Sequence, residues 1–180
     1  MGHKHTKEDI LAGALDAALD DGLSRLTFGR LAKRLGISDR IVVYYFPTKA
    51  ELITEVFVAL GAQLQAGLEP AFADPVADHR QLVRRAWPIV ATSEQDRVFA
   101  LFFEANGLAT VGIEPYASLV PMLVTGWIAW AAALIEGDDE PDRHDEAAAA
   151  IALIDGLLLV RHLAGAEVAD RAMATMIADG

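Results

Sequence analysis

Side chains able to do covalent or metal chemistry are scarce in this sequence and lie far apart. It contains no cysteine, which excludes disulfides, thiol catalysis and zinc sites with cysteine ligands. The five histidines form no His-Glu-x-x-His pair or comparable spacing, so no metal site is predicted. No nucleophile–base pair or phosphate loop stands at a recognisable spacing. We therefore expect neither catalytic residues nor a cofactor, and the protein is not expected to be an enzyme.

A basic segment near the N-terminus is the feature that needs an explanation. The formal net charge of −11 argues, on its own, against a nucleic-acid binder. The charge is uneven, however, because residues 1–50 hold eight basic and six acidic residues, whereas residues 51–180 hold seven and twenty. Within residues 24–49 a single acidic residue, Asp39, stands among six basic ones: Arg25, Arg30, Lys33, Arg34, Arg40 and Lys49.

Helices must position these residues, because apolar positions recur with helical period almost throughout the chain. No stretch alternates as a strand would, so the predicted fold class is all-α. The first helix is expected to start at Thr6, with Asp9 in capping-box position, and to stop at Gly22. Two prolines within residues 70–75 mark a boundary. Beyond it we expect helices over about 78–92, 94–107, 115–136, 144–164 and 167–179, with an exposed acidic loop at 136–146.

Two short helices fall inside the basic segment. Thr27 is placed to cap the first, which carries Ala32 where a small side chain permits a close helix crossing, and Gly36 ends it. Ser38 is placed to cap the second, over about residues 39–45. Short helices joined by a tight glycine turn are the ingredients of a helix-turn-helix.

The second short helix has one face available for recognition. Ile37 and Val42 are expected to anchor it to the core. Thr48 and Glu51 form a further capping box that opens a long helix to about residue 68. Backbone N–H groups at the helix starts after Thr27 and Thr48 can hold phosphates. The outward residues free to enter a major groove are Asp39, Arg40, Val43 and Tyr44.

Two segments, Leu26–Ser38 and Val43–Leu52, resemble the N-terminal domain of the tetracycline-repressor (TetR) family. The family's pattern combines the glycine turn, an aromatic cluster, a short turn and then Lys, Glu and Leu. The resemblance implies an all-helical homodimer of about nine helices. It also implies a three-helix DNA-binding head, here residues 1–50, and a helical-bundle body, residues 51–180, that binds a ligand and dimerises.

The sequence departs from the family's pattern in the recognition helix. Arg40 and Ile41 stand where members often have Gly and then Thr or Ala, and Val43 replaces the usual first aromatic residue, so base recognition is not transferable. Tyr44 and Tyr45 match positions that usually touch DNA, although packing of the pair stays open as an alternative. Arg30, Lys33 and Arg34 are expected to add only diffuse attraction. The residues expected at the DNA are Thr27, Ser38, Asp39, Arg40, Tyr44, Tyr45, Thr48 and Lys49.

Aromatic residues of the body form stripes at helical spacing. Three tryptophans in a small body, and the polar Asn106 among apolar neighbours, favour a ligand pocket. Such stripes also occur in ordinary cores, and this alternative stays open. Glu104 and Asp155 are carboxylates in apolar surroundings, which either orient a ligand or are paired core charges. The residues expected at the ligand are Trp87, Phe99, Phe102, Phe103, Asn106, Leu123, Trp127 and Trp130.

The last two helices carry a further apolar stripe. In the family resemblance, Ile154-Asp155-Gly156-Leu157 is similar to the dimerisation helix of many members. Two such helices from each subunit would form a four-helix bundle on a two-fold axis. The alternative is that both helices only close the core of their own subunit. The residues expected at the dimer interface are Ile151, Ile154, Leu158 and His162.

Together these features predict a ligand-responsive, sequence-specific DNA-binding regulator, in the family most often a repressor released by a small molecule. The expected effector is apolar or aromatic, and the expected DNA partner is a double-stranded operator. The alternative is a dimeric DNA-binding protein without such a switch, whose body serves a protein partner. No signal-peptide apolar region opens the sequence, which predicts a cytoplasmic location. Residues 115–135 are uncharged, but their prolines and acidic flanks favour a buried helix over a membrane span.

Overall fold

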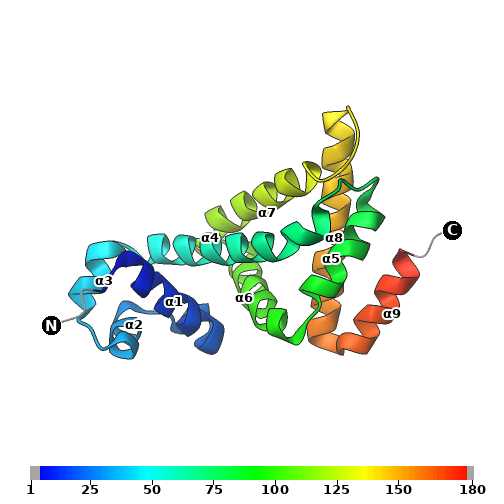
Figure 1. Cartoon of the computed structure of the whole chain (residues 1–180). Helices are drawn as coiled ribbons and strands as arrows, with labels where there is room; N and C mark the ends of the chain where they lie inside the picture. Colours follow the sequence, from blue (N-terminus) through cyan, green and yellow to red (C-terminus); the bar gives the residue numbers. More distant parts are fainter. Residues whose placement is uncertain (1–4, 178–180) are drawn as a thin grey trace. The chain divides into compact units, whose positions relative to one another are not determined.

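The computed structural model describes residues 5–177, and within this range the protein is all-α, as predicted (Figure 1). The N-terminal elements are α1 (Lys7–Asp21), the 3-10 helix η1 (Leu23–Arg25), α2 (Phe28–Leu35), α3 (Asp39–Tyr45) and α4 (Lys49–Leu68). They are followed by the 3-10 helix η2 (Glu69–Phe72), α5 (His79–Val90), α6 (Ser93–Thr110), α7 (Tyr116–Ala132), α8 (Glu140–Ala164) and α9 (Ala166–Met176). The nine described α-helices match the expected number.

The first helix is fixed at both ends by local chemistry. The Thr6 side chain accepts a hydrogen bond from the backbone N–H of Asp9 (3.2 Å), and the Asp9 carboxylate accepts one from the N–H of Thr6 (2.8 Å). This reciprocal pair is the predicted capping box. At the other end Gly22 has a φ of 82°, a backbone conformation that favours glycine.

The helix-turn-helix is built as its sequence predicts. Thr27 caps α2 by accepting a hydrogen bond from the N–H of Arg30 (3.3 Å). Gly36 closes α2 in the left-handed conformation, and the N–H of Ile37 donates to the carbonyl of Ala32 (3.0 Å). Ser38 holds the N-cap position of α3, but its side chain makes no capping hydrogen bond. The predicted position of the cap is therefore confirmed, but the expected hydrogen bond with its side chain is not formed.

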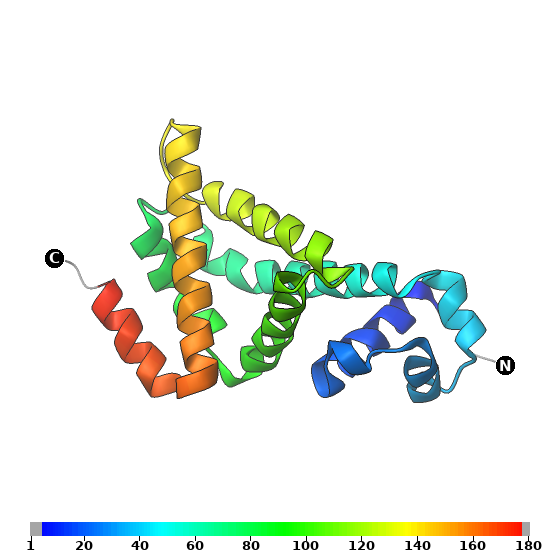
Figure 2. The same cartoon turned by 180° about the vertical axis from the view of Figure 1, so that it is seen from behind.

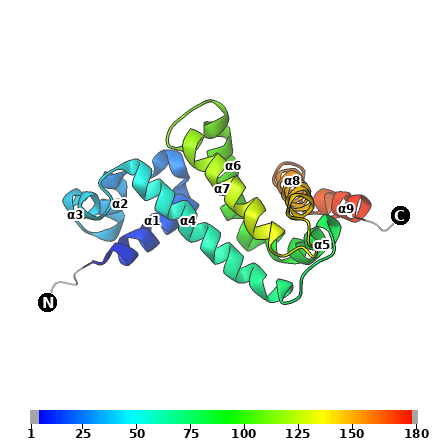
Figure 3. The same cartoon turned by 90° about the horizontal axis from the view of Figure 1, so that it is seen from above.

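Two compact units make up the chain. The first unit consists of Met1–Gln63 and Leu101–Val120, and the second consists of Leu64–Ala100 and Pro121–Gly180. Helices α4, α6 and α7 contribute residues to both. In the second unit α8 packs against α5 and α9, as Figures 2 and 3 show. A functional boundary at residue 50, between head and body, stays a prediction.

Several helix ends differ from the sequence-based expectation. Helix α8 begins at Glu140, so most of the acidic loop expected at residues 136–146 is its first two turns. Pro141 and the acidic residues that follow suit a helix N-terminus, where a missing N–H costs little and negative charge is favourable. Helix α7 ends at Ala132 rather than near residue 136, and α6 extends to Thr110. The last residues of the predicted helix 167–179 lie outside the described residues.

Among the described residues, α8 alone is long and apolar enough to cross a membrane by length and composition. Its buried positions include Ala147, Ala150 and Leu157, and the helix packs against two others of the same unit. One face of α8 is therefore packed within its own unit.

Candidate nucleic-acid interface

Helix α3 is anchored by one side and exposed on the other. Val42 is completely buried, as predicted, whereas Tyr44 is 79% exposed and Val43 also faces solvent. Asp39 and Arg40 are exposed at the start of the helix, and neither has an ion-pair partner within residues 5–177. The face therefore offers a free guanidinium and an exposed aromatic ring, which are side chains able to contact base edges.

The two adjacent tyrosines differ in their surroundings. Their rings meet edge to face, with centroids 4.9 Å apart. Tyr45 is half-buried, and its hydroxyl donates a hydrogen bond to the backbone carbonyl of His5 (3.1 Å). The sequence left open whether both tyrosines pack against the protein. Tyr45 does so, whereas Tyr44 is exposed to solvent.

Two helix starts flank α3 in sequence. Thr48 caps α4 by accepting a hydrogen bond from the N–H of Glu51 (3.1 Å), and Lys49 is exposed in the first turn. Thr27 holds the equivalent position at the start of α2. Free backbone N–H groups, the positive end of the helix dipole and a lysine together suit a phosphate oxygen.

A brace between α1 and α4 supports this arrangement. The Lys7 ammonium forms an ion pair with Glu55 (2.6 Å) and lies 5.3 Å from the centroid of the Phe46 ring. Phe46, which directly follows α3, is buried together with Leu52 and Ile53 of α4. These contacts fix the end of α3 to the first and fourth helices.

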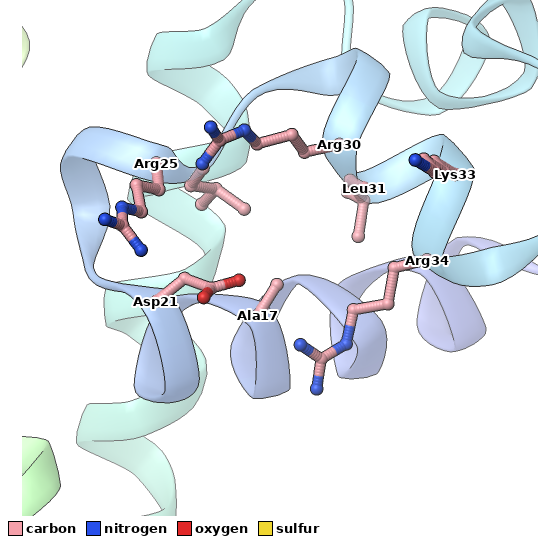
Figure 4. A pocket seen from close by; sticks show the side chains of 8 residues that line it. Ala17, Asp21, Arg25, Arg30, Leu31, Lys33 and Arg34 are labelled. Carbon is pink, nitrogen blue, oxygen red and sulfur yellow. The ribbon is translucent and has the colours of Figure 1, made fainter.

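Basic side chains line a pocket between α1 and α2 (Figure 4), with a volume of about 420 Å³. Arg30, Lys33 and Arg34 project from α2, and Arg25 comes from η1. Arg34 donates a hydrogen bond to Asp20, which raises the pKa of its guanidinium. The other three have no ion pair in the described part of the chain. Asp21 on the α1 side partly offsets their charge, so diffuse attraction remains the predicted role for Arg30, Lys33 and Arg34.

Glu104 of α6 performs a task that the sequence did not reveal. Its carboxylate accepts hydrogen bonds from the backbone N–H groups of Leu23 (2.9 Å) and Ser24 (3.0 Å). It is therefore not a paired core charge, because its partners are neutral amides of η1. Burial raises the pKa of the neighbouring Tyr116 hydroxyl to about 12, and the Glu104 charge adds to this effect. An acidic residue amid apolar neighbours signals a partner, but the sequence does not say which.

Three residues expected at the ligand lie in the first unit. Phe102 and Phe103 are half-buried, with ring centroids 6.1 Å apart. The Oδ1 atom of Asn106 is buried and has no hydrogen-bond partner within residues 5–177. A buried acceptor without a donor is costly, so this atom needs an explanation.

The other five lie in the second unit. Trp87 is buried, and its Nε1–H donates to the carboxylate of Asp170 on α9 (2.8 Å), while Phe99 is also buried. Leu123, Trp127 and Trp130 of α7 are half-buried. The ring of Trp130 meets those of Trp127 (5.3 Å) and Phe72 (6.2 Å) edge to face. Phe72 and Asp170 were not among the expected residues, because both contacts join segments distant in sequence.

The expected dimer residues separate into two groups. Ile154 and Leu158 are only 8% and 2% exposed within the single chain, so they pack in the core of their own subunit. Ile151 is half-buried and His162 is exposed. A different set of apolar side chains on α8 and α9 is exposed: Leu159, Leu163, Val168 and Met176. The dimer stays a prediction, which these exposed residues suit better than the buried pair.

Asp155, also on α8, is an isolated carboxylate. It has no hydrogen-bond or ion-pair partner among the described residues. Burial raises the pKa of Asp155 from its ordinary value of 3.8 to about 6. The paired core charge considered for this residue is thus wrong. Within residues 5–177 no group of three His, Asp or Glu side chains could hold a metal ion.

Helices α2 and α3, joined by the turn at Gly36 and with α3 exposed on one side, form a helix-turn-helix within an all-helical structure. Residues 10–56 match the N-terminal profile described as bacterial regulatory proteins, tetR family. Among curated proteins, none matches the chain in sequence.

Solved structures share the fold over nearly the whole chain. A transcriptional regulator from Rhodococcus sp. Rha1 is 22% identical with a TM-score of 0.74, over 96% of this chain and 94% of that one. A TetR transcriptional regulator from Legionella pneumophila is 23% identical with a TM-score of 0.67, over 98% and 97%. Salmonella enterica GusR is 20% identical with a TM-score of 0.62, over 95% and 94%. The family model thus confirms the resemblance found in the sequence for residues 10–56, and the solved structures show that the chain shares the fold of TetR-family transcriptional regulators.

Proposed function

We propose that this regulator is a cytoplasmic homodimeric repressor that binds a symmetric operator and is released by a small molecule. The observation that carries the proposal is the exposed face of α3, where Arg40 and Tyr44 stand free beside the capped start of α4. A short exposed helix carrying a guanidinium and a phenol fits a DNA major groove.

Phosphate contacts and base contacts divide between different residues of the head. Lys49, with the helix starts after Thr27 and Thr48, is suited to hold phosphates, which positions the protein without reading sequence. Arg40 can donate two hydrogen bonds to the O6 and N7 atoms of guanine. Asp39 and Tyr44 complete the proposed reading surface, and Ser38 and Tyr45 support it.

Dimerisation would use the exposed apolar side chains of α8 and α9. Leu159 and Leu163 lie one turn apart on α8, and Val168 and Met176 continue the exposed set on α9. A second copy of the chain that packed against α8 and α9 would remove these side chains from water. Ile151 and His162, both on α8, would belong to the same interface. Two heads related by a two-fold axis would bind half-sites separated by about 34–36 Å.

The effector would bind beside the half-buried aromatic residues. Asn106 supplies the polar group, because its Oδ1 atom is buried without a donor. An apolar or aromatic molecule that carries an N–H or O–H group would satisfy this atom, so we assign such a donor to the effector. Phe102 and Phe103 are the ring neighbours of the same helix.

The test is selection of bound duplexes from randomised DNA by the purified full-length chain. The proposal expects enrichment of a two-fold symmetric sequence, and loss of binding when a molecule that occupies the body is added. Enrichment of no sequence would contradict DNA-specific regulation. Specific binding that every occupying molecule leaves unchanged would favour the alternative of a DNA-binding dimer whose body serves a protein partner.

A further inference from the structure

The carboxylate of Glu104 joins α6 to the turn that precedes the helix-turn-helix. One oxygen, Oε2, accepts from the N–H of Leu23 at 2.9 Å, and the other, Oε1, accepts from the N–H of Ser24 at 3.0 Å. These are the first two N–H groups of η1, which has no capping side chain of its own. N–H groups at a helix start lack partners within the helix, so an ionised carboxylate is the strongest acceptor they can receive.

Gly22 makes the close approach of Glu104 possible. Its φ of 82° lies in the region that favours glycine. A Cβ atom at this position would lie 3.0 Å from Oε2 of Glu104, which is tighter than most Cβ contacts, so the carboxylate would have to shift by a few tenths of an ångström. The turn is thus shaped both to point its N–H groups outward and to leave room for the carboxylate.

The turn bound by Glu104 leads directly into the head's second helix. Leu23 and Leu26 are buried, and the N–H of Leu26 donates to the carbonyl of Leu23 (3.2 Å). Thr27, the cap of α2, follows at once. Helix α2 packs against α3. A shift of the turn would therefore move α2, and with it the recognition helix α3.

We propose that Glu104 is a positioning residue for DNA recognition, which holds the turn at Leu23 and Ser24 and thereby orients α2 and α3 toward the operator. The inference rests on the proposed function, since it concerns binding of a specific sequence. Loss of the contact removes no basic side chain from the head. It therefore weakens the fit to the operator while leaving the electrostatic attraction to any DNA intact.

The test compares three variants of the full-length chain with wild type. Glu104→Ala removes both acceptors, and Glu104→Gln keeps one acceptor oxygen but loses the charge. Glu94→Gln makes the same charge change on an exposed residue of the same helix and is the matched control. Affinities are measured for the duplex selected by wild type and for an unrelated duplex, at one salt concentration. Amide signals of Leu23 and Ser24 report the contact by NMR.

We expect Glu104→Ala to weaken operator binding by about tenfold or more, with non-specific affinity within about twofold of the control. Glu104→Gln should fall between Glu104→Ala and wild type, and the two amide signals should shift in both variants. Equal loss of specific and non-specific binding would overturn the inference, as would unchanged operator affinity. If Glu104→Ala does not fold, the ratio of the two affinities in Glu104→Gln decides. If the wild-type protein selects no DNA sequence, the proposed function itself fails. This outcome differs from failure of the inference on Glu104, because it is seen before any variant is measured.

Discussion

The hydroxyl of Tyr45 donates a 3.1 Å hydrogen bond to the backbone carbonyl of His5, so the end of the recognition helix is tied to the residue that precedes Thr6, the cap of α1. Its neighbour Tyr44 points outward, and the two rings meet edge to face. A hydroxyl already engaged with the protein is less available to DNA than a free one. We therefore assign the two tyrosines different roles, support for Tyr45 and contact for Tyr44.

This difference predicts opposite outcomes for two substitutions. Tyr44→Ala should weaken operator binding by about 1–3 kcal/mol and relax base preference at one position of each half-site. Tyr45→Phe keeps the ring and removes the hydrogen bond, which should cost about 1 kcal/mol of stability and leave base preference unchanged. Binding selections on randomised half-sites check both. A changed preference in Tyr45→Phe would show that its hydroxyl reads DNA after all.

Substitutions of Lys49 and Arg40 should distinguish a phosphate contact, which positions the protein on DNA, from a base contact, which recognises sequence. Lys49→Ala is expected to weaken specific and non-specific DNA alike and to reduce the salt dependence of binding by about one unit per lost phosphate contact. Arg40→Ala should instead cost about 1–3 kcal/mol at one base position. Titrations at several salt concentrations, with operator and unrelated DNA, give both quantities. If Arg40→Ala lowers only the salt dependence, Arg40 attracts DNA without reading it.

The dimer can be tested at a residue that the single chain leaves exposed. Leu163 is 75% exposed, so Leu163→Glu should dissociate the dimer while leaving the helical content and melting of the subunit unchanged. Val111 is 71% exposed outside α8 and α9, and Val111→Glu is the control that should remain dimeric. Sedimentation at micromolar concentration distinguishes them. A charge at the buried Leu158, by contrast, should unfold its own subunit.

Asp155 makes stability depend on pH with a defined sign. Because the folded-state pKa is raised to about 6, its favourable contribution is present below the unfolded pKa of 3.8 and is lost as pH rises through about 6. At pH 7.5 the charged form is penalised, so Asp155→Asn should stabilise the protein by about 1–3 kcal/mol. The gain should shrink toward pH 5 in denaturant unfolding. The exposed Asp145 on the same helix supplies the control, Asp145→Asn, which should show no such trend.

The unsatisfied side chain of Asn106 should affect the free energy of unfolding even when no ligand is bound. Asn106→Leu removes a buried acceptor that lacks a donor, so it should raise the free energy of unfolding by about 1 kcal/mol. Compounds found by thermal shift that carry an N–H or O–H group should lose affinity for this variant, whereas purely apolar ones should not. Thr110→Val, one turn further along α6, removes a hydroxyl that donates to the backbone carbonyl of Asn106, not to its side chain, and serves as control. Destabilisation by Asn106→Leu would refute the role of an unsatisfied acceptor.

The features that could be predicted from the sequence alone are local ones. Thr6, Thr27 and Gly36 set helix ends through hydrogen bonds and backbone conformations that span four or five residues, and these ends were predicted correctly. The helix-turn-helix follows from the same short-range chemistry together with the buried Val42. Helix α8 shows the limit of such reasoning, because the acidic residues expected in a loop suit a helix start equally well.

Contacts between side chains far apart in the sequence became visible only once the helices were packed together. Glu104 binds amides about eighty residues away, Tyr45 binds His5, and Leu158 turns into its own core rather than outward. A helical stripe states that one face of a helix is apolar, but it does not state what covers that face. The partner depends on how separate helices pack, and packing is set by the shapes of all the side chains that they bury together.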